Sequence, residues 1–249
     1  MKRRDFLTTT AGASVILAAS SIPYALSRRE KQNGTGSMIE NAPEKSDKLQ
    51  PPVKGRIAVA FAISEGVTVI DFAGPWEVFQ DVMLGGSGED MQMPFQLFTV
   101  AEKTEPIRGS AGLKLLPDYT FETAPQPNVL VVPAQRGSSA LHEWLRKVSR
   151  QTDVTMSVCT GAFQLAAAGL LSGKSATTHH EYQDNLSKRY PNSDVKRGVR
   201  FVESDRVSSA GGLTSGIDLA LRVVERYYGR EVAQKTADYM EYQSKGWIV

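Results

Sequence analysis

One cysteine, Cys159, is the residue of this chain best suited to nucleophilic chemistry. It follows the apolar residues 155–158 and precedes Thr160, Gly161 and an alanine-rich run over residues 162–168. The apolar run predicts a buried strand and the alanine-rich run predicts a helix, so Cys159 lies at the turn between them. Free N–H groups at a helix N-terminus favour a thiolate. We therefore expect a nucleophile elbow, with a small buried apolar residue as the alternative reading of Cys159.

Asp71 is the leading candidate for a group that manages protons beside this thiol. It lies just past the carboxyl end of a predicted central strand, which places it at the same sheet edge as Cys159. Like charge raises the pKa of a carboxylate beside a thiolate, so Asp71 could carry protons while the thiolate stays ionised. The alternative is that Asp71 only caps the helix that follows it.

The elements that must hold these two residues alternate along the chain. Strands are predicted over residues 56–62, 95–101 and 129–132, besides the strand before Cys159. Helices are predicted from about Pro75, over residues 138–150, after Cys159 to about Gly173, over residues 181–190, from a Ser215–Asp218 capping box, and over residues 231–242. Residues 107–116 and 199–209 are typical of hairpins, and residues 175–179 of a short strand. This order predicts an α/β fold with a mainly parallel sheet.

The first 26 residues have the layout of an export signal. Lys2, Arg3 and Arg4, followed by Asp5 and an uncharged run to Ala25, resemble a twin-arginine signal. We expect export of the folded protein to the periplasm by the twin-arginine machinery, with an uncleaved inner-membrane anchor as the alternative. The moderate hydrophobicity of the run makes it a poor permanent anchor.

The charge balance argues against a nucleic-acid partner. Three positive charges and one negative charge in the signal account for the whole net charge of +2, so the remaining chain is neutral. Polar residues 27–54 predict a disordered linker, which leaves residues 55–249 as the domain. A single cysteine cannot form an internal disulfide and leaves a free thiol in an oxidising compartment.

Three separated motifs resemble the ThiJ/PfpI family in the expected order. They are residues 157–161 (SVCTG), 169–179 (GLLSGKSATTH) and 210–221 (AGGLTSGIDLAL), and the resemblance spans about residues 56–242. It implies a flavodoxin-like three-layer sandwich of the class I glutamine amidotransferase-like type, a nucleophile-elbow cysteine and a homodimer. Within the family the chain is most similar to isocyanide hydratases and to the ligand domain of AraC-type regulators.

The resemblance also implies roles for individual residues. In the hydratases an acidic residue before a Gly-Pro pair acts with the cysteine, and Asp71 in DFAGP matches that position. Thr160 stands where protease-like and glyoxalase-like members carry His. Ala134 and Gln135 replace two glycines of the family, and Gln135 is expected to narrow or re-polarise the pocket. His179 and His180 are expected near the pocket, with a structural role for His179 as the alternative, and His142 on the surface.

Together these features predict a cysteine-dependent hydratase or lyase acting on a small electrophilic substrate, such as an isocyanide converted to an N-formamide. Cys159 attacks carbon, Asp71 moves protons, and backbone N–H groups around Thr160 and Ala134 hold developing charge. Gly161 belongs to the same turn. No cofactor or metal is expected, because three histidines and one cysteine lack ligand spacing. The alternative is a non-enzymatic periplasmic protein that binds a ligand or senses oxidants.

Overall fold

Apolar runs form the centre of one seven-stranded sheet in the computed structural model, which describes residues 48–85 and 90–249. The strand order is β10-β11-β7-β6-β1-β2-β5. All neighbours are parallel except β10 and β11, which form an antiparallel hairpin. The bounds are β1 (Ile57–Ala62), β2 (Phe95–Ala101), β5 (Tyr119–Thr120), β6 (Val129–Val132), β7 (Val154–Val158), β10 (Phe201–Ser204) and β11 (Val207–Ala210).

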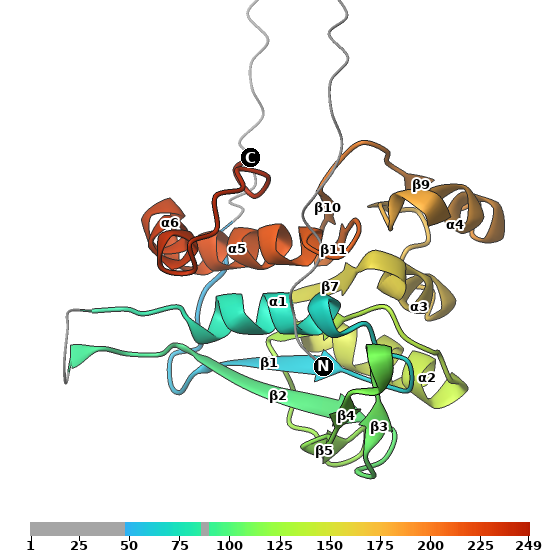
Figure 1. Ribbon diagram of the computed structural model, residues 1–249, viewed down its shortest axis with the longest axis horizontal. Helices are drawn as coiled ribbons and strands as arrows, with labels where there is room; N and C mark the ends of the chain where they lie inside the picture. Colours follow the sequence, from blue (N-terminus) through green and yellow to red (C-terminus); the bar gives the residue numbers. More distant parts are fainter. Residues whose placement is uncertain (1–47, 86–89) are drawn as a thin grey trace, which may run out of the picture. The chain divides into compact units, whose positions relative to one another are not determined.

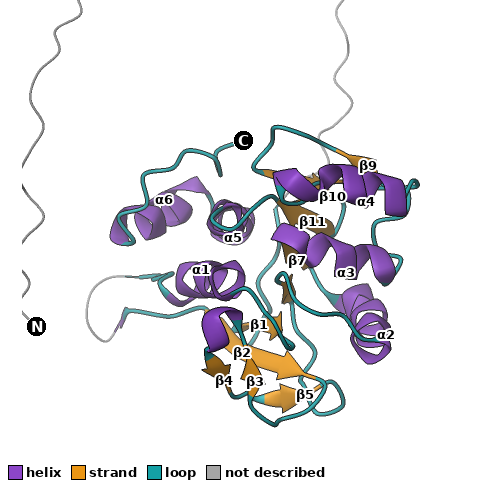
Figure 2. Ribbon diagram, turned by 45° about the vertical axis from the view of Figure 1, so that its right-hand side comes forward, coloured by secondary structure: helices purple, strands orange, loops and turns teal. Residues whose placement is uncertain are grey.

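Helices cover both faces of this sheet, which makes a three-layer α/β sandwich (Figures 1 and 2). One face carries α1 (Val69–Gln80), α5 (Ser215–Tyr228) and α6 (Arg230–Tyr239). The other face carries α2 (Ser139–Val148) and α3 (Ala162–Ala167), and α4 (Gln183–Arg189) lies on the same side. The fold class expected from the alternation of strands and helices is confirmed.

Side-chain alternation along β1 divides the interior into two cores. Ile57, Val59 and Phe61 pack with residues of α1, α5 and α6, whereas Ala60 and Ala62 pack with residues of α2 and α3. Successive strand residues point to opposite faces, so a strand covered on both sides must be apolar throughout. The alanines on the second face leave room for the larger Leu141, Trp144 and Leu165 of the helices.

Two small sheets complete the fold. β3 (Ile107–Arg108) and β4 (Lys114–Leu115) form the antiparallel hairpin predicted between residues 107 and 116. β8 (Ser175–Ala176) is the short strand predicted before His179, and it pairs in parallel with β9 (Asp194–Val195). Short 3-10 turns over Ser110–Gly112, Ser149–Gln151, Cys159–Gly161 and His180–Tyr182 join neighbouring elements.

Four predicted helix boundaries are wrong, among them the end of α6, which is at Tyr239 rather than Tyr242. α1 begins at Val69, so Pro75 lies inside the helix rather than in its first turn, and it leaves the Asp71 carbonyl without its helical donor. The cysteine helix α3 ends at Ala167, well before Gly173. The capping box is absent, because Ser215 is already helical and Asp218 instead pairs with Arg200.

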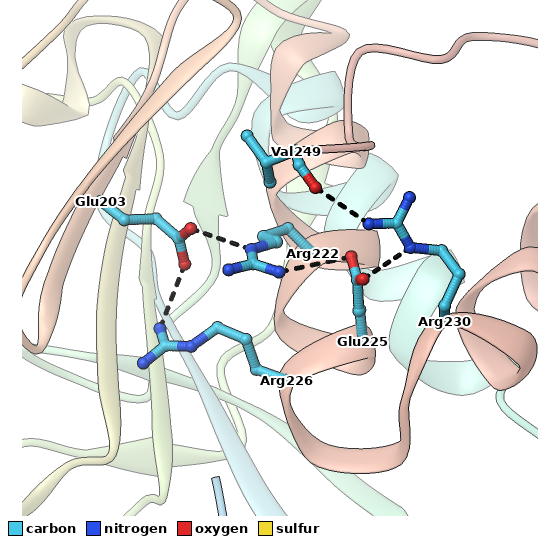
Figure 3. Close-up of polar contacts among 6 residues, drawn as sticks. All are labelled: Glu203, Arg222, Glu225, Arg226, Arg230 and Val249. Atoms are coloured by element: carbon cyan, nitrogen blue, oxygen red, sulfur yellow. Dashed lines mark hydrogen bonds and ion pairs between the residues drawn. The ribbon is translucent and has the colours of Figure 1, made fainter. Parts of the chain in front are cut away.

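Ion pairs fasten α5 to β10 and to the chain end (Figure 3). Glu203 accepts from Arg222 at 2.9 Å and from Arg226 at 3.3 Å. Glu225 pairs with Arg230, whose guanidinium also donates to the main-chain oxygen of Val249 at 3.1 Å. The carboxyl end of the chain is therefore held against the helical layer.

The predicted signal over residues 1–26 and most of the predicted linker lie outside the described residues. Leu49 is described, and its N–H donates to the carbonyl of Arg226 at 2.8 Å. Its side chain packs against the first core, so contacts with the domain begin before residue 55. Within residues 48–85 and 90–249, no helix has both the length and the apolar composition to cross a bilayer.

Candidate active site

Cys159 occupies the sharp turn between β7 and α3, as predicted. Its φ is 57°, in the left-handed region that a side chain with a Cβ rarely adopts. Two hydrogen bonds fix the turn: the Cys159 N–H donates to the carbonyl of Gly211, and Thr178 Oγ1 donates to the carbonyl of Cys159, each at 2.8 Å. Strained backbone of this kind persists only where the surroundings enforce it, and it concentrates at functional sites.

Gly161 is required for this turn to pack. A Cβ at this position would lie 2.1 Å from the carbonyl oxygen of Val132 and 2.9 Å from Pro133. The start of the cysteine helix therefore touches the backbone at the end of β6. This close approach brings Ala134, just beyond β6, beside Cys159.

Asp71 is fully buried in the first turn of α1 and does not cap that helix. Its Oδ2 accepts from the N–H of Ala134 at 3.1 Å, and its Oδ1 has no hydrogen-bond partner among the described residues. Burial raises the pKa of Asp71 to about 6, while the Ala134 N–H and the Cys159 thiol hold it down. The rise was predicted, but its main cause is loss of water rather than like charge.

The resting thiol differs from the prediction. Burial and the negative charge of Asp71 raise the pKa of Cys159 and outweigh the hydrogen bonds from Thr160 and from the backbone N–H of Leu213. The shift in the pKa of Cys159 is therefore opposite to the one that the expected thiolate requires, and Asp71 is the group of the pair that loses its proton more readily. The arrangement suits a carboxylate that takes the thiol proton at the moment of attack.

Ala134 and Gln135 have different roles from those expected. The N–H of Ala134 is already donated to Asp71, so it orients the carboxylate instead of waiting for a developing anion. Gln135 does not line the cavity at Cys159, because its amide donates to the carbonyl of Ala62 at the end of β1 at 2.8 Å. The main-chain carbonyl of Gln135 accepts a hydrogen bond from the side-chain amide of Gln164 of α3 at 3.1 Å.

Sequence reasoning missed Leu213, whose backbone N–H faces the sulfur beside that of Thr160. Leu213 also has a positive φ of 47°. The preceding Gly211-Gly212 pair marks a loop after a strand, which is the signal that could have identified it. The pair of N–H groups that can stabilise negative charge is therefore Thr160 and Leu213, not Thr160 and Ala134.

Cys159 opens into a cavity of about 570 Å³. The lining residues are Thr68, Ala134, Cys159, Thr160, Phe163, Gln164, His179, Glu181, Tyr182, Arg189 and Leu213. His179 thus reaches the cavity as predicted, with its ring packed where Gly212 leaves room, since a Cβ there would lie 2.6 Å from His179 Cδ2.

The other two histidines lie elsewhere. The His180 ring is tilted by 31° against the His179 ring, with centroids 4.4 Å apart, and His180 lines a neighbouring cavity of about 440 Å³ rather than the one at Cys159. His142, predicted to be a surface residue, is partly buried and lies 2.8 Å from Gln164 Oε1 through its Nε2. Because the Gln164 amide nitrogen already donates to Gln135, His142 Nε2 is the donor in this contact.

A parallel α/β sandwich with a strained cysteine at a strand-to-helix turn and a buried carboxylate beside it defines the nucleophile-elbow class of protein. Residues 57–226 match the DJ-1/PfpI family, and this match covers well over half of the chain. The chain therefore belongs to that family.

Relatives within this family have different activities. The chain is 32% identical over 194 residues to an isonitrile hydratase of Pseudomonas putida, with 75% of this chain and 78% of the relative covered. It is also 32% identical over 138 residues to the transcriptional regulator CdhR of Pseudomonas aeruginosa, where 53% of this chain matches only 41% of the regulator.

Solved structures agree on the fold. A ThiJ/PfpI family protein from Pseudomonas syringae superimposes with a TM-score of 0.65 at 25% identity, over 84% of this chain and 83% of that protein. Drosophila melanogaster DJ-1beta superimposes with a TM-score of 0.64 at 17% identity, over 77% of this chain and all of that protein. The latter likeness concerns the fold alone.

Proposed function

We propose that this protein is a cysteine-dependent hydratase that converts small isocyanides into N-formamides. One observation carries the proposal: the fully buried Asp71 lies beside the thiol of Cys159, which opens into a cavity, and Asp71 Oδ1 has no hydrogen-bond partner within the described residues. A carboxylate with a pKa of about 6 is ionised at neutral pH and basic enough to accept a proton from a thiol. The hydratase among the relatives supports the same reaction.

The proposed reaction begins with addition of the thiol to the isocyanide carbon. Asp71 takes the proton from Cys159, the sulfur forms a bond to the terminal carbon, and the proton is delivered to that same carbon. The product is a thioimidate, R–N=CH–S–Cys159, in which no atom has been oxidised or reduced. The N–H groups of Thr160 and Leu213 stabilise the sulfur while it is negatively charged.

Water then releases the product. It adds to the thioimidate carbon as Asp71 accepts one of its protons, and the carbon–sulfur bond breaks to return the thiolate, which regains a proton from Asp71. The released R–N=CH–OH tautomerises to the formamide R–NH–CHO. In the net reaction one isocyanide and one water give one formamide, and the enzyme is returned unchanged.

The test measures formamide production by the purified protein with small aliphatic and aromatic isocyanides. We expect Cys159→Ala to abolish turnover and Asp71→Asn to lower kcat by about 10²- to 10⁴-fold, the range for loss of a general acid–base group. Mass spectrometry of the intact wild-type protein under single-turnover conditions should detect the thioimidate. Turnover that survives in Cys159→Ala would sink the mechanism.

Ligand binding without turnover is the second candidate, because several relatives are transcriptional regulators. In that case the cavity would bind a small molecule and Asp71→Asn would leave affinity nearly unchanged. Redox sensing is less well supported, since the raised pKa of Cys159 keeps the thiol protonated and slows its oxidation. The same isocyanide assay separates the hydratase from the binding protein.

A further inference from the structure

The cavity at Cys159 ends in a charged rim formed by the segment around α4. Glu181 and Tyr182 come from the 3-10 turn before α4, and Arg189 is the last residue of that helix. Among the described residues that line this cavity, Arg189 is the only lysine or arginine and Glu181 is the only carboxylate. The two lining charges therefore come from one short segment that the elbow does not include.

Arg189 has no acidic partner within the described part of the chain, although basic residues near it do. Arg197 pairs with Asp184, and Lys188 also acts on that carboxylate. Glu181 lies in the same lining as Arg189, yet the two do not form an ion pair. The guanidinium thus keeps its capacity to bind an anion.

Aromatic contacts hold this guanidinium in place. It lies over the ring of Tyr190, with its central carbon 5.6 Å from the ring centroid. Tyr190 in turn meets the edge of Phe163, another lining residue, at a centroid distance of 6.4 Å. Phe163 belongs to α3, so the cation is linked through two rings to the helix that follows the nucleophile.

We propose that Arg189 makes the cavity selective for electrophiles that carry a carboxylate, which it binds while the electrophilic carbon reaches Cys159. This inference rests on the proposed function for the identity of the electrophile. Guanidinium groups bind carboxylates through two parallel hydrogen bonds, which orient the bound molecule as well as attract it. Glu181 and the buried Asp71 repel the carboxylate, whereas the guanidinium of Arg189, the one lysine or arginine in the described lining, attracts it.

The first test does not require turnover. Cys159 is alkylated with iodoacetate, which is anionic, and with iodoacetamide, which is neutral and of similar size. Intact-protein mass spectrometry follows both reactions at low ionic strength. The quantity compared between variants is the ratio of the two rate constants. Asp71 affects this ratio equally in every variant that retains it. A difference in the ratio between variants therefore measures the effect of the charges on the cavity rim.

We expect Arg189→Gln to lower the iodoacetate-to-iodoacetamide ratio by about two- to fivefold, the upper range for a charge pair of an exposed side chain such as Arg189. Glu181→Gln should raise it, and both changes should shrink in 0.5 M salt because the charges are screened. Lys188→Gln is the matched control, since Lys188 is exposed on the same helix but does not line the cavity. A ratio in Arg189→Gln that equals the wild-type ratio, or falls equally in Lys188→Gln, overturns the proposal.

The second test compares isocyanoacetate with its methyl ester as substrates. Arg189→Gln should lower kcat/KM for the acid relative to the ester by a similar factor. If the wild-type protein hydrates neither compound, the proposed reaction fails, whereas the alkylation ratio still decides the role of Arg189. If both compounds are hydrated and Arg189→Gln does not change their ratio, the inference fails and the proposed reaction stands.

Discussion

At the scale of single residues, the chemistry of the site depends on whether Asp71 or Cys159 holds a proton. Asp71 is fully buried and has a pKa of about 6 against an ordinary 3.8, so the folded state binds a proton there more tightly than the unfolded state. Stability therefore falls as pH rises through the window from about 4 to 6, and the cost at neutral pH is about 3 kcal/mol. A cost of that size at a buried position is consistent with a functional carboxylate rather than a structural one.

The proton balance predicts the pH dependence of catalysis. Asp71 must be ionised to accept the thiol proton, so kcat/KM should fall about tenfold per pH unit below pH 6. The measurement is kcat/KM for one isocyanide between pH 4.5 and 8, restricted to conditions in which circular dichroism shows the folded protein. A profile that is flat across pH 6 would contradict the role of Asp71.

At the scale of elements, close packing sets the position of Asp71. Gly74 of α1 meets Ile217 of α5, and a Cβ at Gly74 would lie 2.9 Å from Ile217 Cγ1. Gly216 of α5 in turn admits Val158 and Pro75, where a Cβ would approach Val158 to 2.9 Å. The two glycines let α1 lie close to α5 and to the end of β7, which brings the first turn of α1 to the elbow.

A second linkage comes from the opposite helical layer. His142 of α2 donates to Gln164 of α3, Gln164 donates to the carbonyl of Gln135, and the neighbouring Ala134 donates to Asp71. Gln135 is further anchored to β1 through Ala62. The loop after β6 is therefore fixed on both sides, and the Ala134 N–H is held toward the carboxylate.

This linkage predicts that His142 is a positioning residue. His142→Ala should lower kcat/KM by about two- to fivefold, the value of one hydrogen bond. It should also move the acidic limb of the pH profile to higher pH. A less firmly held Ala134 N–H lowers the pKa of Asp71 less effectively than in the wild-type protein. His142→Gln, which can still donate, should restore most of both effects, and the neighbouring Glu143→Ala is the control. An unmoved limb in His142→Ala would show that the contact only stabilises α2.

At the scale of the whole molecule, the carboxyl-terminal segment packs against the helices of the first core and supports the loop of residues 211–214 at the site. Trp247 is fully buried in the first core, and Arg230 stacks on it at 5.3 Å. Ser244 donates to Asp218, which pairs with Arg200, and Arg200 reaches Thr214 at 3.2 Å, one residue after Leu213. The last residues thus help to position the loop that presents an N–H to Cys159.

Loss of Trp247 should therefore weaken both the fold and the site. Trp247→Ala should lower the free energy of unfolding by about 3–5 kcal/mol, the usual cost of removing a large buried aromatic side chain. Urea unfolding measures the change, with Ile248→Ala as the control because Ile248 is 41% exposed. A loss smaller than about 1 kcal/mol would mean that the segment is not part of the cooperative unit.

Much of the fold could be predicted from local patterns. β2 and β6 begin and end where predicted, and β6 is uniformly apolar because it is buried on both faces. The elbow followed from one cysteine between an apolar run and a helix-forming run. The start of α1 was missed because Thr68, Val69 and Ile70 have low helix propensity, and Pro75 looks like a first-turn residue when tertiary packing is ignored. The capping box failed because Asp218 is paired with Arg200 from a distant loop.

The sequence by itself determined the order of strands and helices, the nucleophile at its turn and the acidic residue that joins it, because these depend on residue type and short-range spacing. Only the tertiary structure decided the charge states of Cys159 and Asp71, since burial and not local sequence sets their pKa values. It also gave the Ala134 N–H to Asp71, brought Leu213 to the sulfur and placed Arg189 on the cavity rim. Each of these depends on contacts between segments far apart in the chain.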